Sequence, residues 1–273
     1  MGTFEVAFLG TNGSCAYNNG DRKKYGTNTL CIALAVGEEV LIFDSGSGIC
    51  GLSGLQGYQG YQGVHRRLFY THYHLDHLDG LLFCTELFDP KKSFDLYGVD
   101  AEGADLRTTL ERILTRPISP IGFEAFLADV SFHSFTPGDT FEYPGGVTVR
   151  TQLLLHPGGS IGYRVEYGGK VFCCCADVEL SAYRETAGLL EFIKGADMLL
   201  LDSFFDDGKV ISGWGHSSWR ECAQWAAKAG VKRLALVHYA PGFSDDRIDE
   251  MERKAQAVFP DTFAAADHMR LTL

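Results

Sequence analysis

Four side chains able to bind metal ions fall within six residues of this sequence, in the string Thr71-His72-Tyr73-His74-Leu75-Asp76-His77. The string directly follows the apolar run Leu68–Tyr70, which is typical of a strand end. In an extended chain alternate residues point to the same side, so His72 and His74 can bind one ion, while the turn that follows presents Asp76 and His77 to a second. Imidazole and carboxylate without thiolate are the ligands expected of a catalytic zinc, manganese or iron ion, and they leave room for bound water. The spacing therefore predicts two metal ions.

Short β-branched and aromatic runs alternate with helical patterns along the chain, and no linker, long charge block or low-complexity tail divides it. We therefore expect one domain over residues 1–273, with two sheets packed face to face and helices outside, because both strand-rich halves have apolar faces to bury. The expected strands are Thr3–Leu9, Thr29–Val36, Val40–Asp44, Arg67–Tyr70, Phe94–Tyr97, Val147–Leu155, Ile161–Tyr167, Lys170–Ala176, Met198–Asp202, Arg233–His238 and Met269–Leu273. The expected helices are Leu75–Thr85, Glu102–Leu114, Ala182–Lys194, Ser218–Ala229 and Asp245–Val258.

Three local patterns refine this outline. Ser218 and Glu221 fit a capping box, which predicts a helix start at Ser218, and Gly230 ends that helix. The segment Gly51–Gly63 has glycine at every third position but no proline, and we expect a mobile surface loop. The adjacent cysteines Cys173–Cys175 lie in an apolar run that indicates a buried strand, where neighbouring side chains point to opposite faces and cannot share an ion.

Composition and charge exclude several classes of protein. The 273 residues are 45% hydrophobic and 22% charged, as in ordinary folded proteins. A net charge of −11 disfavours large nucleic acid as a partner, because such binding depends on basic surface. The sequence shows no apolar stretch of about 20 residues, so we expect no membrane span and a cytoplasmic protein. The 8 cysteines show no C-x-x-C pair and are expected to be buried thiols.

Further polar residues stand at the ends of apolar strands. His156, Asp177 and His238 each follow a run of aliphatic, alanine or cysteine residues. Loops at one edge of a sandwich can converge on a shared site, so these three residues are candidate ligands together with the histidine string.

Several longer motifs share one pattern of glycine, histidine and aspartate. They are Phe8–Ser14, Tyr25–Thr29, Phe43–Gly48, the histidine string, His156–Arg164, Ala176-Asp177, Gly215-His216-Ser217-Ser218 and Val237–Pro241. Together they resemble the metallo-β-lactamase fold superfamily, and more narrowly its phosphodiesterase branch, which includes ribonuclease Z and the small cyclic-phosphate phosphodiesterases. The histidine string is specific for the superfamily, and Gly-His-Ser-Ser narrows the resemblance to that branch.

The resemblance implies an α+β fold, the four-layer αβ/βα sandwich, and a dinuclear site. One ion would be held by His72, His74 and His156, the other by Asp76, His77 and His238, with Asp177 bridging the two. Zinc is the metal most expected, while manganese and iron also suit these ligands. Asp76 would thus belong to the catalytic machinery as well as to the metal site. The resemblance also implies that Asp44 orients a ligand imidazole, although Asp44 can instead cap the helix or turn after its strand.

The charge of such a site suggests its chemistry. Two dications minus the charges of Asp76 and Asp177 leave a positive open face that attracts phosphate, and a metal-bridging hydroxide can attack phosphorus in line. His216 would act as general acid or electrostatic clamp, although it can also simply cap the turn before the helix. Asp202 can orient His216 or serve as a structural carboxylate.

The leading hypothesis is a dinuclear metal-dependent phosphodiesterase acting on a small anionic phosphodiester, such as a cyclic nucleotide or cyclic sugar phosphate. The first alternative is ribonuclease Z-like processing of tRNA 3′ ends, which the acidic balance and the lack of a long basic insertion disfavour. The second alternative is hydrolysis of a thioester, lactone or β-lactam. The third alternative is a non-enzymatic role as a metal-dependent scaffold. Flavin-linked di-iron electron transfer is disfavoured, because that relative normally has glutamate where His74 stands. A homodimer is compatible with a helical exterior.

Overall fold

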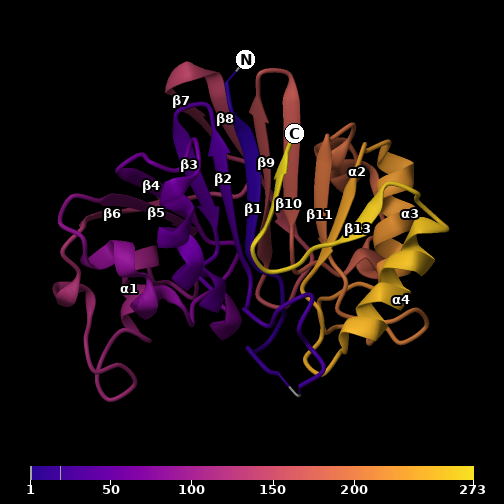
Figure 1. The fold of residues 1–273 in the computed structure, drawn as a ribbon, viewed down its shortest axis with the longest axis horizontal. Coiled ribbons are helices and arrows are strands. Elements are labelled where there is room, and N and C mark those ends of the chain that lie inside the picture. Colours follow the sequence, from indigo (N-terminus) through magenta and orange to yellow (C-terminus); the bar gives the residue numbers. More distant parts are fainter. Residues whose placement is uncertain (1, 19) are drawn as a thin grey trace.

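Two seven-stranded sheets form the centre of the computed structural model, which describes residues 2–18 and 20–273. In spatial order, the first sheet contains β14 (Met269–Thr272), β1 (Phe4–Gly10), β2 (Cys31–Val36), β3 (Glu39–Phe43), β4 (His65–Phe69), β5 (Ser93–Val99) and β6 (Asp129–Phe135). The second contains β13 (Thr262–Ala264), β12 (Leu234–Val237), β11 (Met198–Asp202), β10 (Lys170–Cys175), β9 (Ser160–Tyr167), β8 (Val147–Leu154) and β7 (Thr140–Tyr143). Figure 1 shows the two sheets side by side in the middle of the molecule.

Helices cover the outer face of each sheet. The short helix α1 (Leu106–Glu111) lies outside the first sheet, and α2 (Ala187–Ile193), α3 (Trp219–Ala229) and α4 (Asp245–Gln256) lie outside the second (Figure 1). Short 3-10 segments complete the layers: η1 (Ser47–Gly57), η2 (Leu75–His77), η3 (Leu81–Phe83), η4 (Thr85–Phe88), η5 (Phe123–Ala125), η6 (Pro144–Gly146) and η7 (Leu180–Ala182). Among the described residues, no helix combines the length and apolar character needed to cross a bilayer.

Side chains that point alternately to the two faces of each sheet form three apolar layers. In β1, Val6 and Phe8 pack between the sheets, whereas Ala7 and Leu9 face the outer layer of the first sheet. In β10, Cys174 packs between the sheets and Cys173 and Cys175 pack against the helices of the second sheet. The three cysteines therefore lie in a buried strand, as the sequence predicts. The layers confirm the expected four-layer αβ/βα sandwich.

Parallel pairing sets the edge at which functional loops meet. Strands β3, β4, β5 and β6 run parallel to one another, as do β10, β11, β12 and β13. The carboxyl ends of parallel strands lie at the same edge of a sheet, which is where open sheets usually bind ligands. The residues that follow β3, β4, β10 and β12 are therefore gathered at one edge of the sandwich.

Several predicted elements were wrong in extent. The expected helix Leu75–Thr85 is a series of 3-10 turns, and the expected helix Glu102–Leu114 shortens to Leu106–Glu111. The segment Gly51–Gly63 is not simply a surface loop, because η1 extends into it and buries Leu52 and Leu55 against the first sheet. Three strands, β6, β7 and β13, were not predicted from the sequence, since the first two are partly exposed edge strands and the third is three residues long.

Asp267, just before β14, joins the C-terminal segment to two loops near the strand ends. Its carboxylate accepts hydrogen bonds from the Asn28 amide at 2.9 Å and the Thr11 hydroxyl at 3.2 Å. The Thr11 carbonyl in turn accepts the His238 amide at 2.7 Å. Burial raises the pKa of Asp267 to about 6, although the bonds from Asn28 and Thr11 oppose the shift.

This raised pKa predicts a pH-dependent stability. The folded chain favours the protonated form of Asp267, so this residue stabilises the fold at low pH. Its contribution to the free energy of unfolding is fully present below the unfolded pKa of about 3.9, and it is lost as pH rises through about 6. Relative to Asp267→Asn, the wild-type free energy of unfolding is expected to increase by about 1 kcal/mol between about pH 7.5 and pH 5. Urea unfolding of both proteins at the two pH values measures this difference. A constant difference would contradict the raised pKa.

Candidate metal centre

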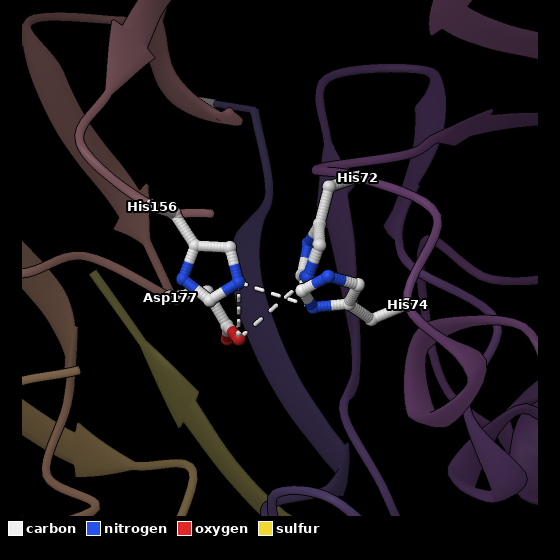
Figure 2. A group of neighbouring side chains, drawn as sticks. All are labelled: His72, His74, His156 and Asp177. Carbon is white, nitrogen blue, oxygen red and sulfur yellow. Dashed lines mark hydrogen bonds and ion pairs between the residues drawn. The ribbon is translucent and has the colours of Figure 1, made fainter. Parts of the chain in front are cut away.

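The candidate ligands converge at the shared edge of the two sheets. His72 and His74 follow β4 in the first sheet, whereas His156 follows β8 and Asp177 follows β10 in the second. Figure 2 shows these four side chains pointing toward one another from the two sides of the sandwich. Asp76 and His77 lie in η2, and His238 directly follows β12. All seven predicted ligands are therefore brought together from sequence positions far apart.

The first group consists of His72, His74, His156 and Asp177, with one nitrogen or oxygen from each within 4.8 Å of the others. His156 Nε2 lies 3.1 Å from His74 Nδ1. Oδ2 of Asp177 lies 3.7 Å from His72 Nε2 and 3.8 Å from His156 Nε2 (Figure 2). Donor atoms that share a tetrahedral zinc ion at about 2.1 Å lie about 3.4 Å apart, so this group fits one ion.

The second group consists of Asp76, His77 and His238. Oδ2 of Asp76 lies 3.5 Å from His77 Nε2 and 3.3 Å from His238 Nε2. The other carboxylate oxygen of Asp177, Oδ1, lies 3.5 Å from His77 Nε2 and 3.1 Å from His238 Nε2. Asp177 thus presents one oxygen to each group, which is the placement that a bridging carboxylate needs.

The chemistry of these donors fits cations better than a hydrogen-bonded core. Nε2 of His72, Nε2 of His77 and Oδ1 of Asp177 are buried and have no hydrogen-bond partner among the described residues. Buried polar atoms are normally paired, because an unpaired one costs about 1–3 kcal/mol. Two unpaired imidazole nitrogens beside an unpaired oxygen of Asp177 indicate a site built for metal ions, and the donor groups present fit two ions.

Neighbouring groups hold the candidate ligands in place. Asp44 Oδ2 lies 2.8 Å from His77 Nδ1, and the amide and hydroxyl of Thr71 donate to the same carboxylate. The Ser14 amide donates to Asp76 Oδ2 at 2.7 Å. The structure therefore places Asp44 where it orients an imidazole, and the alternative role of simple turn cap does not describe its contacts.

The local electrostatics separate the histidines into two kinds. Burial lowers the pKa of His72, His74 and His156, which favours the neutral imidazole that binds metal. Burial alone would also lower the pKa of His77, but Asp177 and Asp44 raise it well above its ordinary value. A positive charge is therefore favoured beside His77 Nε2.

Three residues of the site have a left-handed backbone. The φ angles are 61° at Asp44, 56° at Asp177 and 58° at His238. Residues other than glycine rarely adopt this conformation, and it concentrates at functional sites, where the surrounding structure holds it in place. Each of the three turns the chain sharply after its strand, which aims the side chain at the shared edge.

His216 lies beside the two groups, and its Nδ1 is 3.1 Å from Asp202 Oδ2 and 3.9 Å from Asp177 Oδ2. The ring of Phe204 stacks on it with centroids 4.5 Å apart. Burial would lower the pKa of His216, but Asp202 and Asp177 raise it to about 9. Asp202 therefore contacts His216 directly, and both residues adjoin the candidate ligands.

Comparison with known proteins places this geometry in a family. A family model described as "Beta-lactamase superfamily domain" matches residues 65–239. This chain belongs to the metallo-β-lactamase superfamily. A ribonuclease Z from Metallosphaera sedula is 26% identical over 245 residues, covering 74% of this chain and 79% of the relative.

Solved structures support the same superfamily fold. The metallo-β-lactamase fold protein YhfI from Bacillus subtilis matches with a TM-score of 0.76 and 20% identity over 100% of both chains. The short form of human tRNase Z has a TM-score of 0.68 and 22% identity over 98% of both chains. Zinc-bound PqqB from Methylobacterium extorquens has a TM-score of 0.69 and 21% identity over 98% of this chain and 100% of that one.

The family model confirms the superfamily that the motifs indicate. The sequence similarity to ribonuclease Z supports the phosphodiesterase branch of that superfamily. Together they also confirm the expected enzyme class, a metal-dependent hydrolase, at that general level. The assignment of individual ligands, and of His216 and Asp76 as catalytic residues, stays a prediction that the geometry supports.

One feature of this member of the metallo-β-lactamase superfamily was not predicted from the sequence. Glu179, two residues after Asp177, is buried and accepts hydrogen bonds from the amides of Gly213 and Gly215. The Gly215 carbonyl lies 2.8 Å from His156 Nδ1. Glu179 therefore holds the segment that positions both His156 and His216. A carboxylate two residues from a candidate ligand was the available signal for this role. The glycines that it binds, however, are more than 30 residues away in the sequence.

Proposed function

We propose that this protein is a dinuclear metal-dependent phosphodiesterase that hydrolyses a small phosphodiester, with cyclic diesters among the candidates. The observation that carries the proposal is the position of Asp177, whose two oxygens face two separate groups of donors. The relative named ribonuclease Z supports phosphodiester chemistry.

In this proposal His72, His74 and His156 would hold one ion, Asp76, His77 and His238 would hold the other, and Asp177 would contribute to both sites. Zinc suits the donors best, since imidazole and carboxylate predominate and zinc-bound PqqB shares the fold. When bound, two such ions supply an activated water molecule and positive charge for the phosphate oxygens.

The protein's own residues then orient groups and move protons. Asp202 holds Nδ1 of His216, which leaves the opposite ring nitrogen to give a proton to the departing alkoxide. In the metal-free protein the neighbouring carboxylates raise the pKa of His216 to about 9, and of these Asp202 lies outside the proposed ligand set and favours the protonated imidazole whether or not metal is bound. Asp44 keeps His77 in its orientation, and Glu179 keeps the segment before His216 in place.

Processing of tRNA 3′ ends is the second candidate function. The observation in its favour is the likeness to ribonuclease Z and to human tRNase Z over most of the chain. Against it stands the charge of the chain, with 24 Lys and Arg against 35 Asp and Glu, because tRNA presents a dense array of phosphates. We therefore rank the small phosphodiester first.

A substrate panel tests the proposal. Zinc-loaded protein is expected to contain about two ions per chain and to hydrolyse bis-p-nitrophenyl phosphate and at least one cyclic nucleotide or cyclic sugar phosphate. The same panel contains a precursor tRNA, a thioester and a lactone. Preference for precursor tRNA would favour the second candidate, and preference for the acyl substrates would overturn phosphodiester hydrolysis.

The role of Asp44 gives a separate prediction. Replacement by asparagine removes the charge that supports His77, so Asp44→Asn is expected to weaken metal affinity about 10- to 100-fold. Competition with a chromophoric chelator measures this change. Asp95→Asn is a matched control, because Asp95 also contacts a histidine, His65 at 3.0 Å, but lies outside the site. Equal effects of the two substitutions would contradict a role for Asp44 at the metal.

A further inference from the structure

Arg22 carries a positive charge into the interior of the protein, where the residue is only 4% exposed. Its guanidinium donates from Nε to the Phe243 carbonyl at 2.6 Å and from Nη1 to the Gly26 carbonyl at 3.3 Å. Nη2 donates to the side-chain oxygen of Asn12. These three acceptors are neutral, so they offset the cost of burying the charge less than carboxylates would. Packing alone therefore does not explain an arginine at this position.

The three acceptors of Arg22 come from segments that belong to different sheets. Asn12 follows β1 and Gly26 precedes β2, both in the first sheet, whereas Phe243 lies between β12 of the second sheet and α4. The planar fork of a guanidinium can bind several fixed oxygens at once, which a lysine ammonium does less well. Asn12 adds to this connection, since its side-chain amide donates to the Gly26 carbonyl at 3.1 Å and its backbone forms a bridge to Tyr239. Arg22 and Asn12, which we call the arginine clamp, thus connect the two sheets.

The loop next to the clamp, Gly13 and Ser14, touches two of the candidate ligands in the second group. Gly13 packs against the His238 ring so closely that a Cβ at this position would lie 2.4 Å from His238 Cε1. The Ser14 amide donates to Asp76 Oδ2 at 2.7 Å. Because Asn12 directly precedes this loop, a displacement of the clamp would move both contacts.

The candidate ligands in the first group are supported elsewhere. Among the described residues, no hydrogen bond or ion pair joins His72, His74 or His156 to the clamp or to the adjoining loop. His156 Nδ1 instead lies 2.8 Å from the Gly215 carbonyl, in a segment that Glu179 holds. Apart from the carboxylate that they share, the two groups of donors therefore have separate supports.

We infer, on the basis of the proposed two-ion site, that Arg22 acts through Asn12 as a positioning residue for the second ion alone. That ion is the one assigned to Asp76, His77 and His238. Without the clamp the adjoining loop is free to shift, and two of these ligands lose the contacts that fix their separation. The first ion does not depend on the clamp, so the two halves of the metal centre differ in what holds them, whatever substrate is hydrolysed.

Two single-ion variants allow the sites to be measured separately. His156→Ala protein retains the second site, and His238→Ala protein retains the first. Adding Arg22→Met, which keeps a long side chain but removes every donor, is expected to weaken zinc affinity about tenfold or more in the His156→Ala protein. In the His238→Ala protein the same substitution is expected to change zinc affinity by less than about twofold. Competition between each chelator-treated protein and a chromophoric chelator for zinc measures both affinities.

Arg164→Met is the matched control. Arg164 also donates to two backbone carbonyls, those of Phe192 at 2.8 Å and Lys194 at 3.2 Å, but these lie at the end of α2, outside the metal centre. This substitution should leave zinc affinity unchanged in both single-ion variants. Circular dichroism of every metal-free variant checks that the fold is retained before zinc is added.

Two milder substitutions keep the test available if Arg22→Met does not fold. Arg22→Lys retains the charge but not the fork, so only part of the second-site affinity should remain, and full affinity would contradict the clamp. Asn12→Ala should weaken the second site, and Arg22→Lys should add little to that loss, because both substitutions remove the same connection. Fully additive losses would show that the two residues act separately and would overturn the inference.

The outcomes for wild-type protein separate the inference from the proposed function. If wild-type protein binds only one zinc ion, the dinuclear proposal fails, and the role of Arg22 fails with it. If wild-type protein binds two ions and Arg22→Met weakens both sites equally, or neither, the dinuclear proposal stands and only the positioning role of Arg22 is wrong.

Discussion

Replacement of Asp177 by alanine is expected to lower kcat/KM for bis-p-nitrophenyl phosphate by at least about a thousandfold, since metal ions contribute several kcal/mol to the stabilisation of the transition state. Asp177 has one carboxylate oxygen beside each of the two groups of donors. Its loss should therefore disturb both ions at once, and metal analysis of the purified variant is expected to show fewer than two ions per chain. Activity with zinc in the assay buffer is measured alongside.

The matched control for this experiment is Asp207→Ala. Asp207 is exposed and pairs with Arg220 at 2.6 Å, away from the candidate ligands. This control should retain wild-type activity and metal content. An Asp177→Ala protein with two ions per chain and undiminished activity would remove the bridging role, and with it the main support for the dinuclear proposal.

Replacement of His216 by alanine has the second large expected effect. A general acid typically contributes about a hundredfold to ten-thousandfold, and its contribution is greatest when the leaving group is a poor one. We therefore expect His216→Ala to reduce kcat by about a hundredfold or more on a cyclic nucleotide, whose leaving group is a sugar alkoxide. On a p-nitrophenyl ester, whose phenolate leaves without a proton, the loss should be much smaller.

The pH profile provides a second readout for His216. The wild-type kcat on the cyclic substrate should fall on the alkaline side as the imidazole loses its proton, and the variant should lack this decline. His133→Ala is the control, because His133 also pairs with an aspartate, Asp95 at 3.3 Å, but outside the site. Equal losses on both kinds of leaving group would show that His216 clamps the phosphate instead of donating a proton.

The sequence predicted the site better than it predicted the helices. The histidine string is local, and its spacing alone places His72, His74, Asp76 and His77 near each other. The strand ends before Asp177 and His238 were also visible, because β10 and β12 are nearly continuous apolar runs of the kind expected in a sheet covered on both faces. The strand before His156 alternates between buried and more exposed residues, and only its end, Leu153–Leu155, is a continuous apolar run. The expected fold follows from these runs.

Other features were set by contacts that no local pattern records. The segment after His77 turns as 3-10 helix instead of continuing as an α-helix, and in it the Gly80 amide donates to the Ser45 carbonyl at 2.9 Å. The role of Glu179 depends on glycines that the fold brings to it. The left-handed backbone at Asp177 and His238 likewise arises from the tertiary structure, since Asp and His adopt it more often than most residues but still only in a small minority of positions. The predicted single domain, homodimer and cytoplasmic location stay predictions.

The division of the candidate ligands between the two sheets has a consequence for how the protein matures. Neither half of the chain provides all the candidate ligands. The loops of the first sheet carry His72, His74, Asp76 and His77, and those of the second sheet carry His156, Asp177 and His238. An ion can be captured firmly only after the halves have docked, and once captured it resists their separation. Metal binding would thus depend on correct assembly of both halves, since a chain with one misfolded half could neither bind metal ions tightly nor hydrolyse a substrate.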